Sequence, residues 1–405
     1  MLPHKARRVC DSPAPCTSGL TASRSVRVPA SVGDPLSAVE TPALVCDLDK
    51  AETNIRHFED TMRDFPSVRL RPHFKSHKSV DLCKVQLQSP LVSGFCCQKT
   101  SEAEAMAEAG INDILLTNEV VVERKINRLL GLLQRHETLR LAVLVDDPSE
   151  ASKLSSFAAH AQVELGVLVE LDCGGGRCGV TSVQECVSLA QTLHALPALR
   201  FRGIQAYHGT AQHLRTPQER KAAIDSVLLT LREVRSRLSE LGVPCAEITG
   251  GGTGTYLHEA ASGVYTEVQA GSFRFNDVDY GANQDAHGVQ LSDSEWQFSL
   301  SVLSTVMSRN ERQRKCVTDA GMKAHSVDSG PPRLLHAVEG AEVRNGGDEH
   351  LIITYPEGIA VPQLGSQVSV VPGHCDPTVN MHDFLVATRQ GVVVGVFPLA
   401  RGPGF

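Results

Sequence analysis

The stretch at residues 71–78 (RPHFKSHK) contains Lys75, the residue whose side chain is the clearest candidate for covalent chemistry. It follows a short β-like run at 67–70 and precedes a segment with helical character at 80–88. This order places Lys75 near the carboxyl end of a strand, where α/β proteins keep their reactive groups. A lysine that loses its solvation there has a lowered pKa, and its neutral amine can form a Schiff base. The alternative interpretation is a basic surface turn, because most lysines are solvated.

Residues 250–255 (GGGTGT) could bind an anion. Successive glycines let backbone N–H groups point into one concavity and approach a phosphate closely, and threonine hydroxyls add donors. The segment follows the seventh of eight apolar runs, and a barrel commonly binds phosphate in the loops after strands seven and eight. It is neither a Walker A loop nor a complete GxGxxG motif, so a flexible glycine turn is the alternative.

Residues 172–179 (DCGGGRCG) match GxGxxG formally, through Gly174, Gly176 and Gly179. A dinucleotide site also requires an acidic residue at the end of the next strand. The next apolar run ends in IQAY at 204–207, which includes no acid. We therefore interpret the glycines as a tight turn that presents Arg177, a fixed cation, beside an anionic cofactor.

Tyr207, His208 and His213 form a third group of candidates, after the sixth apolar run. A tyrosine ring can stack on a flat cofactor, and histidine titrates near neutral pH, which suits proton transfer. For each histidine the alternative is a hydrogen-bonded structural role. His213 is the better candidate because its position predicts a loop rather than a place against the sheet.

His374 and Asp376, within residues 372–377 (PGHCDP), are the best metal candidates. In an extended segment these two side chains project to one side and Cys375 projects to the other. Imidazole with carboxylate suits Mn²⁺, Mg²⁺ or Zn²⁺, whereas a thiolate ligand would favour zinc. Two protein ligands leave positions for water and a substrate hydroxyl, as in catalytic sites. A Pro-Gly turn with incidental polar residues is the alternative.

An alternation of apolar runs and helix-period segments must position these residues. Eight runs read as strands, at 68–74, 91–97, 113–117, 139–145, 165–171, 199–207, 244–249 and 265–270. Helical segments lie between them, including 101–109, 119–134, 149–160, 182–195 and 217–241. Apolar strands that alternate with helices indicate parallel β-structure buried on both faces. Eight units in roughly 220 residues predict an α/β protein with a (β/α)8 TIM barrel rather than an open doubly wound sheet.

A second, all-β domain is predicted after about residue 290, where the helical periodicity fades. Short alternating strands follow at 295–307, 315–319, 333–343, 350–354, 367–371, 383–388 and 391–398. We therefore expect a barrel at 39–290, which would bind the cofactor, and a β domain at 291–405, which would carry the metal candidates. A further strand at 42–48 precedes the barrel and could pair with the second domain.

Residues 1–38 have a different composition and are predicted to be a disordered extension. They are rich in Ser, Ala, Pro and Arg, and Asp11 is their only acid before Asp34. This composition is typical of a chloroplast or mitochondrial transit peptide, and the absence of an apolar h-region disfavours secretion. The alternative is a tail without a targeting signal, which would leave the protein in the cytoplasm.

The composition argues against several classes of protein. The 405 residues carry a net charge of -7 without a long basic run after the first residues, so no nucleic-acid partner is expected. No apolar stretch is long enough to span a bilayer, so no membrane partner is expected. The 12 cysteines are scattered and form no CxxC pair. Several lie in apolar runs, namely Cys46, Cys96, Cys97 and Cys245. This pattern predicts reduced, buried thiols rather than disulfides or a zinc ribbon.

Five motifs taken together resemble those of a known family. They are 71–78, 171–179 (LDCGGGRCG), 205–209 (QAYHG), 250–253 (GGGT) and 374–376 (HCD). In this order they resemble the D-threonine aldolase and eukaryotic D-serine dehydratase family, and most closely D-threonine aldolase. The resemblance covers residues 40–400. It implies an alanine racemase-like, fold-type III pyridoxal phosphate enzyme that acts on a small D-amino acid and forms a homodimer.

The resemblance implies how the cofactor would be held. Lys75 would carry pyridoxal 5'-phosphate as a Schiff base, with Lys78 as the next candidate. Arg177 and Tyr207 would border the ring. The phosphate would be held by Gly251, Gly252 and Thr253.

The resemblance also implies a base and a metal site. His213 would be the base, and His374 and Asp376 would bind a divalent cation. A His-x-Asp pair resembles the aldolase branch and a His-x-Cys pair the zinc dehydratase. The carboxylate of Asp376 therefore favours Mn²⁺ or Mg²⁺, although Zn²⁺ is also compatible.

The implied reaction is the retro-aldol cleavage of D-threonine and related D-β-hydroxy-α-amino acids to glycine and an aldehyde. The metal would lower the pKa of the β-hydroxyl, the base would take its proton, and the cofactor would accept electrons. The alternative enzymes are a zinc-dependent D-serine dehydratase, which forms pyruvate and ammonia, and an amino-acid racemase, which needs no metal. A non-enzymatic pyridoxal phosphate carrier would resemble the barrel alone, so the second domain argues against it.

Overall fold

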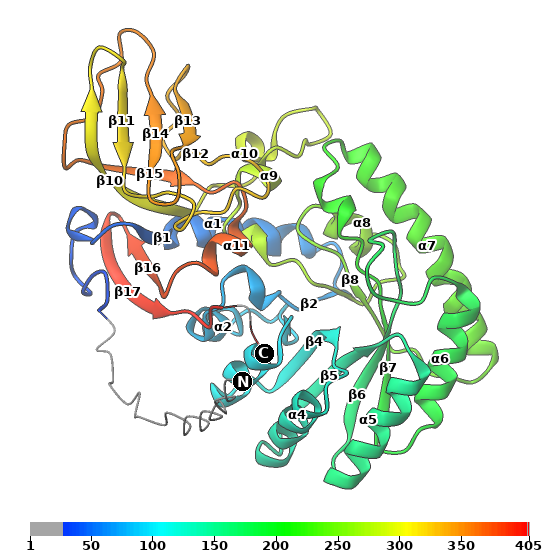
Figure 1. Ribbon diagram of the computed structural model, residues 1–405. Coiled ribbons are helices and arrows are strands. Elements are labelled where there is room, and N and C mark those ends of the chain that lie inside the picture. The colour runs from blue at the N-terminus through cyan, green and yellow to red at the C-terminus, as the bar shows by residue number, and fades with distance from the viewer. Residues whose placement is uncertain (1–26, 403, 405) are drawn as a thin grey trace, which may run out of the picture.

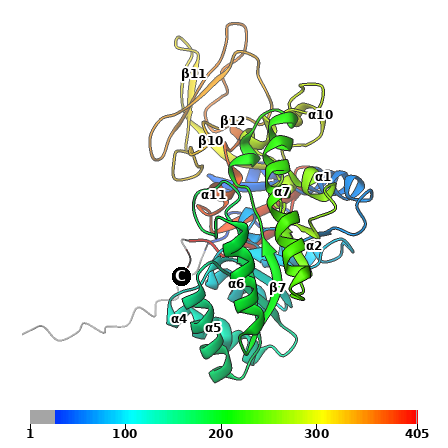
Figure 2. The ribbon, with the colours of Figure 1, turned by 90° about the vertical axis from the view of Figure 1, so that its right-hand side faces the viewer.

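The computed structural model describes residues 27–402 and 404, so most of the predicted targeting segment, residues 1–26, lies outside the described residues. The described chain forms two sheets, one of eight strands and one of nine (Figure 1). Helices wrap the outside of the first sheet, and the second sheet stands beside it (Figures 1 and 2).

The first sheet is parallel, in the order β2-β9-β8-β7-β6-β5-β4-β3. Its two ends are joined by parallel bridges from Leu70 to Val92 and from His73 to Cys96, so the sheet closes on itself. Its strands are β2 (Arg69–Leu70), β3 (Phe95–Cys97), β4 (Asp113–Glu119), β5 (Arg140–Val145), β6 (Leu165–Glu170), β7 (Leu199–Gln205), β8 (Glu247–Gly250) and β9 (Glu267–Val268). The predicted fold, a (β/α)8 barrel with an additional β domain, is confirmed.

The helices of the barrel begin at sequence signals that satisfy their first N–H groups. The side chains of Ser182 and Thr216 form capping boxes, and Asp147 caps a helix whose first residue is proline. These helices are α1 (Leu48–Met62), α2 (Val80–Gln86), α3 (Thr100–Glu108), α4 (Glu123–Arg135), α5 (Pro148–Ala161), α6 (Val183–Ala195), α7 (Pro217–Glu240) and α8 (Tyr256–Ala260). The helix predicted at 119–134 starts later, because β4 continues to Glu119 and three β-branched valines follow it.

Residues of the barrel strands alternate between two apolar clusters. Leu115, Leu144 and Leu168 face a small cluster inside the barrel, whereas Leu116 and Val145 pack in the cluster that includes the surrounding helices. At the carboxyl ends of the strands the inward positions become polar and open onto a cavity. This change of side-chain character marks the end of the barrel that can bind a ligand.

The second sheet follows the path β13-β14-β11-β10-β1-β16-β17, with β15 paired to β10 and β12 paired to β15. Its strands are β1 (Ala43–Asp47), β10 (Leu300–Asn310), β11 (Lys315–Thr318), β12 (Arg333–Leu334), β13 (Glu342–Asn345), β14 (Leu351–Thr354), β15 (Gln367–Val371), β16 (Phe384–Arg389) and β17 (Val392–Pro398). β1 precedes the barrel in the sequence but pairs with β10 and β16, as the sequence suggested. The single strand predicted at 333–343 is divided into β12 and β13, because Gly340 turns the chain at φ +76°.

Short elements join the two sheets beside the mouth of the barrel. They are α9 (Val278–Gly281), α10 (Leu291–Ser294), α11 (Cys375–Val379) and the 3₁₀ turns η1 (Leu36–Ala38), η2 (Phe74–Ser76), η3 (Thr210–His213) and η4 (Ser272–Arg274). The N–H groups of Val278 and Asp279 donate to the carbonyls of Pro372 and Gly373 at 3.2 and 3.1 Å. The loop with the metal candidates is therefore bonded directly to a segment that follows the last barrel strand.

Residues 27–38 do not follow the prediction of disorder. The N–H of Gly33 donates to the carbonyl of Val393, and that of Leu36 to the carbonyl of Gly391, both at 2.8 Å. These bonds attach the segment to the edge of the second sheet. Nowhere in residues 27–402 does a helix have the length and apolar character that a membrane crossing requires.

The cysteines agree largely with the prediction of reduced, buried thiols. All ten that the structure describes are free, and seven of them are buried. Cys245 is only half-buried, contrary to the prediction, and Cys178 is exposed. Cys10 and Cys16 belong to the part of the chain that is not described.

Candidate active site

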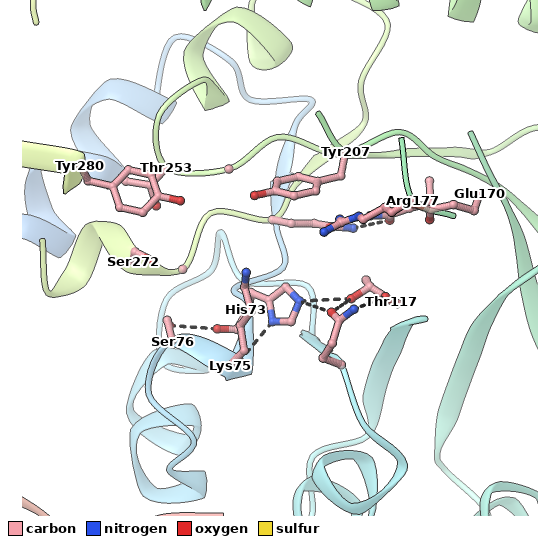
Figure 3. Close-up of a pocket in the computed structure, with 15 residues that line it drawn as sticks. His73, Lys75, Ser76, Thr117, Glu170, Arg177, Tyr207, Thr253, Ser272 and Tyr280 are labelled. Carbon is pink, nitrogen blue, oxygen red and sulfur yellow. Dashed lines mark hydrogen bonds between the residues drawn. The ribbon is translucent and has the colours of Figure 1, made fainter. Parts of the chain in front are cut away.

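A cavity of about 260 Å³ opens at the carboxyl ends of the barrel strands (Figure 3). Seven of the eight strands supply a lining residue at or just beyond their ends, and the segment from η4 to α9 closes the remaining side. The lining residues are His73, Lys75, Ser76, Gln98, Thr117, Glu170, Arg177, Gln205, Tyr207, Gly252, Thr253, Gln269, Gly271, Ser272 and Tyr280. The cavity thus gathers residues from almost every motif that the sequence suggested.

Lys75 lies in η2, directly after β2, and its Nζ is 3.1 Å from Asp376 Oδ2. The lysine and one predicted metal ligand, three hundred residues apart in the chain, are therefore neighbours. Burial lowers the pKa of Lys75, but the carboxylate of Asp376 and the hydroxyl of Tyr207 outweigh it, so the pKa is raised. The lowering of the Lys75 pKa that the sequence analysis expected is therefore not found, because the carboxylate of Asp376 lies within ion-pair distance of its Nζ. In turn, burial raises the pKa of Asp376, but Lys75 and His374 hold it well below its usual range.

Lys78, the second lysine of the same stretch, does not reach the cavity. It is buried, and its Nζ donates to Glu102 Oε1 at 2.5 Å. Its backbone takes the left-handed conformation at φ +49°, which turns the chain into α2. This pairing makes Lys78 a structural residue and leaves Lys75 as the only lysine among the described residues that lines the cavity.

The glycine-rich turn after β8 presents backbone donors to the cavity. Gly252 and Thr253 line it, and their N–H groups donate to no residue within the described ranges. A Cβ on Gly252 would lie 2.4 Å from Gln212 Oε1, and one on Gly250 would lie 2.1 Å from the carbonyl oxygen of Ala206. Gly251 takes φ +73° and supports the turn without lining the cavity. Only glycine fits these positions, and the result is a concavity of free N–H groups suited to an anion.

Arg177 and Tyr207 lie together at one side of the cavity (Figure 3). The guanidinium carbon of Arg177 is 5.6 Å from the centre of the Tyr207 ring. The turn that carries Arg177 is held by Asp172, whose Oδ1 accepts the N–H groups of Gly174 at 2.9 Å and Gly176 at 3.1 Å. The glycines thus form the tight turn that the sequence predicted, and Arg177 enters the cavity from it.

His374 and Asp376 converge, although not in the predicted way. His374 is extended and caps α11, whereas Cys375 is already the first residue of that helix and is buried in the core of the second sheet. His374 Nε2 lies 4.0 Å from Asp376 Oδ2, and Nδ1 of the same ring pairs with Asp328 Oδ2 at 2.8 Å. Asp328 fixes the ring so that Nε2 faces Asp376. An imidazole nitrogen and a carboxylate oxygen in this arrangement suit a divalent cation.

His213 lies at the end of η3, just outside the residues that line the cavity. Its Nδ1 donates to Asp279 Oδ2 at 2.5 Å, and its ring centre is 5.9 Å from that of Tyr280. The other oxygen of Asp279 accepts from Arg215 Nη2 at 2.5 Å. Because a carboxylate can only accept, Nδ1 carries the proton and Nε2 is left free to accept one.

Comparison with known proteins identifies the family. The profile of the alanine racemase N-terminal domain matches residues 46–277, and that of the serine dehydratase domain matches residues 299–388. The chain is 42% identical over 379 residues to the 3-hydroxy-D-aspartate aldolase of Paracoccus denitrificans (strain Pd 1222), covering 93% of this chain and 96% of that one. It is also 42% identical over 375 residues to the D-threonine aldolase of Arthrobacter sp, covering 92% and 96%. The crystal structure of D-threonine aldolase from Filomicrobium marinum matches with a TM-score of 0.86 and 38% identity, over 92% of this chain and 98% of that one.

The chain belongs to the D-threonine aldolase and D-serine dehydratase family. The resemblance drawn from the five motifs is therefore confirmed, and the protein is an enzyme of the lyase class. Pyridoxal phosphate is the cofactor that membership of this family implies. The cavity fits such a group, because it offers one lysine, a cradle of free N–H groups, an aromatic ring and a fixed cation at its wall.

Several lining residues of this family member were not foreseen. Glu170, Gln205 and Gln269 occupy inward positions at strand ends, and a polar residue in an inward register was the signal that could have revealed them. His73 is buried, and its Nε2 lies 3.2 Å from Gln98 Oε1 and 3.1 Å from Thr117 Oγ1. Burial lowers the pKa of His73 to about 3, so its ring is neutral.

Two acids outside the lining, Asp279 and Asp328, gave no signal in the sequence at all. Each orients a histidine that is distant in the chain, His213 and His374 respectively. Their roles depend on how α9 and the segment after β11 pack, which no local pattern encodes.

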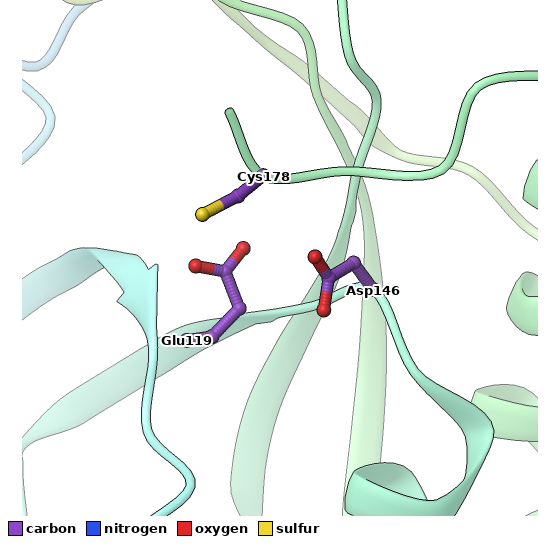
Figure 4. Close-up of side chains that lie close together, drawn as sticks. All are labelled: Glu119, Asp146 and Cys178. Carbon is purple, nitrogen blue, oxygen red and sulfur yellow. The ribbon is translucent and has the colours of Figure 1, made fainter. Parts of the chain in front are cut away.

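Glu119, Asp146 and Cys178 form a compact cluster beside the cavity (Figure 4). Their ligand atoms all lie within 4.8 Å of one another. Asp146 Oδ2 accepts the N–H of Gly179 at 3.0 Å, which holds the end of the turn that carries Arg177. The cluster therefore helps to fix the position of Arg177.

Proposed function

We propose that this protein is a D-threonine aldolase, which cleaves D-threonine and related D-β-hydroxy-α-amino acids to glycine and an aldehyde. One observation carries the proposal: Lys75 Nζ lies 3.1 Å from Asp376 Oδ2, next to His374. A single small hydroxy amino acid can therefore reach a cofactor on Lys75 and a cation on the His374/Asp376 pair at once. The two relatives at 42% identity described above are named 3-hydroxy-D-aspartate aldolase and D-threonine aldolase.

In this proposal the cavity residues hold pyridoxal phosphate. Lys75 would hold it through its amine, the N–H groups of Gly252 and Thr253 would bind its phosphate, and Arg177 and Tyr207 would border its ring. Gly251 shapes the turn. When bound, the cofactor supplies an electron sink for the pair left on Cα as the Cα–Cβ bond breaks.

The proposal also assigns a divalent metal to His374 and Asp376. The cation supplies charge that lowers the pKa of the substrate hydroxyl. A carboxylate ligand favours a hard ion such as Mn²⁺ or Mg²⁺. Cys375, whose thiolate would favour zinc, is buried in the core instead. Asp328 supports the site by fixing the ring of His374.

His213 takes the proton of the β-hydroxyl in this scheme, directly or through one water. Its Nε2 is free because Nδ1 donates to Asp279, and Asp279 stabilises the imidazolium that forms. Arg215 keeps Asp279 in place and ionised. The α9 segment that contains Asp279 donates to the carbonyls of Pro372 and Gly373, so the residue that orients the base is bonded directly to the loop that precedes the metal ligands.

A D-serine dehydratase is the second candidate, because residues 299–388 match the serine dehydratase domain. One assay separates the two: purified protein is given D-threonine, 3-hydroxy-D-aspartate and D-serine, with Mn²⁺ or with a chelator. We expect an aldehyde product that depends on the metal. Keto acid and ammonia from D-serine without aldehyde would favour the dehydratase, and indifference to both metal and substrate would favour a cofactor carrier. That the protein forms a homodimer and that its N-terminal segment targets it to an organelle remain predictions.

A further inference from the structure

A second cavity, of about 340 Å³, lies next to the active site between α1, α2 and η4. Most of its wall is apolar, and Phe58, Leu70, Val92 and Phe273 contribute to it. One cation also lines it, Arg274 at the end of η4. Nothing in the proposed aldolase reaction uses this cavity.

The guanidinium of Arg274 is buried and has no hydrogen-bond partner within the described part of the chain. Arg274 is 2% exposed, and no residue in the described part of the chain accepts a hydrogen bond from it or pairs with it. Arg71, which is equally buried, bonds to Glu267 and Asp113 at 2.7 Å each. Buried arginines are normally paired in this way, because an isolated charge in a protein interior is strongly unfavourable.

The groups around Arg274 do not neutralise it. Burial raises the pKa of the Cys46 thiol to about 12 and also raises that of Cys83, so both are uncharged. Burial and the Arg274 charge lower the pKa of His77 to about 3, so its ring is neutral. Glu52 is the one carboxylate that acts on Arg274, and it is bonded to Arg389. The positive charge thus lacks a counter-ion among the described residues, while a cavity lies open beside it.

We propose that this cavity binds a carboxylate with an apolar chain. The planar guanidinium matches a carboxylate, and the apolar wall accepts a chain of a few carbons. Among residues 27–402 no second cation lines the cavity, so a single carboxylate is the expected anion. Two sources share this chemistry, a short fatty acid and an apolar amino acid. Glu52 and Glu59 also line the cavity and would meet the ammonium group of the latter.

The cavity adjoins the active site through η4. Ser272, its first residue, lines the active-site cavity and donates to Asp376 Oδ1 at 3.3 Å. The N–H of Phe273 donates to Thr253 Oγ1 at 3.1 Å. A ligand on Arg274 would therefore hold a three-residue turn whose other side contacts the active site. Bound carboxylate should change the KM of the lyase reaction as well as protein stability.

Titration calorimetry on the full chain tests the proposal. The probes are hexanoate, norleucine, hexanol and hexylammonium, which share one chain length. The variant is Arg274→Met, and the matched control is Arg235→Met, an exposed arginine of α7. We expect one of the carboxylates to bind the wild type and the control, with Kd roughly ten- to hundred-fold weaker in Arg274→Met. Hexanol and hexylammonium should bind no better to the wild type than to the variant.

The two carboxylates distinguish the sources. Tighter binding of hexanoate indicates a fatty acid, and tighter binding of norleucine indicates an amino acid. Val85→Trp, at the exposed edge of the cavity, is a second variant that leaves Arg274 intact and should also weaken binding. The proposal fails if neither carboxylate binds the wild type. It fails too if binding survives unchanged in Arg274→Met, or in Val85→Trp should Arg274→Met not fold.

Discussion

The two ends of the barrel handle charge in opposite ways. At the amino-terminal end, Arg71 bonds to Asp113 and Glu267, the first residues of β4 and β9. Arg202 likewise donates to Glu247, the first residue of β8, at 2.9 Å. At the carboxyl end, Glu170 is 6% exposed and its Oε2 has no partner among the described residues, and Gly252 and Thr253 keep free N–H groups.

This difference separates structural charges from binding charges. At the amino-terminal end, which we call the floor, the buried guanidinium groups of Arg71 and Arg202 are paired, because a charge withdrawn from water is unfavourable without a counter-ion. An open mouth keeps donors and acceptors unpaired for a ligand to satisfy. The two lysines of one stretch differ in their place rather than in their pairing: Lys78 pairs with Glu102 in the interior, whereas Lys75 lines the cavity and pairs with the metal candidate Asp376.

The largest effect is expected at the mouth, on replacing Lys75 with alanine. The Lys75→Ala variant should lose lyase activity by more than roughly a thousand-fold, and with it the absorbance band of a lysine-bound cofactor. In Lys78→Met the band should persist while thermal stability falls, because Glu102 stays buried without its cation. A band that survives in Lys75→Ala and disappears in Lys78→Met would reverse this assignment.

The next largest effect is expected at the floor. Arg71→Met leaves the buried Glu267 without its cation, whereas Asp113 keeps Arg140, and should lower the free energy of unfolding by about 3–5 kcal/mol. Urea denaturation measures this loss. Activity per folded molecule should change little, since Arg71 does not line the active-site cavity. If activity falls while the free energy of unfolding is unchanged, then Arg71 acts in binding or catalysis, and the separation of structural charges at the amino-terminal end from binding charges at the carboxyl end is wrong.

A smaller effect is expected from the acid that orients the base. Asp279→Asn should lower kcat by roughly ten-fold and shift the pH profile, with KM largely kept, because a misoriented His213 accepts the proton less often. Arg215→Met should have a milder effect of the same kind. If Tm falls and the loss of kcat follows only from the smaller folded fraction, with the pH profile unchanged, Asp279 acts only on the fold.

The last effect concerns pH and His77, a buried histidine two residues after Lys75. The pKa of His77 in the folded protein is about 3, below its value near 6.5 in an unfolded chain. As pH falls below 6.5 the unfolded chain takes up a proton that the folded protein does not, so folding stability decreases. His77→Gln should flatten this dependence by about 1.4 kcal/mol per pH unit between pH 6 and 4. An unchanged slope in urea titrations would contradict the burial of a neutral His77.

The barrel could be predicted because its strands are buried on both faces, which gives apolar runs such as the one at β6. The positions of Lys75, Arg177 and Tyr207 followed from the rule that strand ends converge. The conformation at Cys375 did not follow, because a short helix replaces the expected extended chain there. The paired state of Lys75 and the unpaired state of Arg274 depend on contacts across the whole chain, which no local pattern reports.

The place of β1 has a consequence for how the chain is made. Val45 pairs with Ser301 of β10 on one side and Val386 of β16 on the other, so a central strand of the second sheet is synthesised first. Its partner strands emerge from the ribosome only after the entire barrel. Until then the apolar strand β1 has no strand to pair with. A fragment that starts at residue 291 would lack the strand between β10 and β16. The unpaired edges of these two strands could then pair with other chains and cause aggregation. The second domain can therefore be expected to fold only when β1 is present.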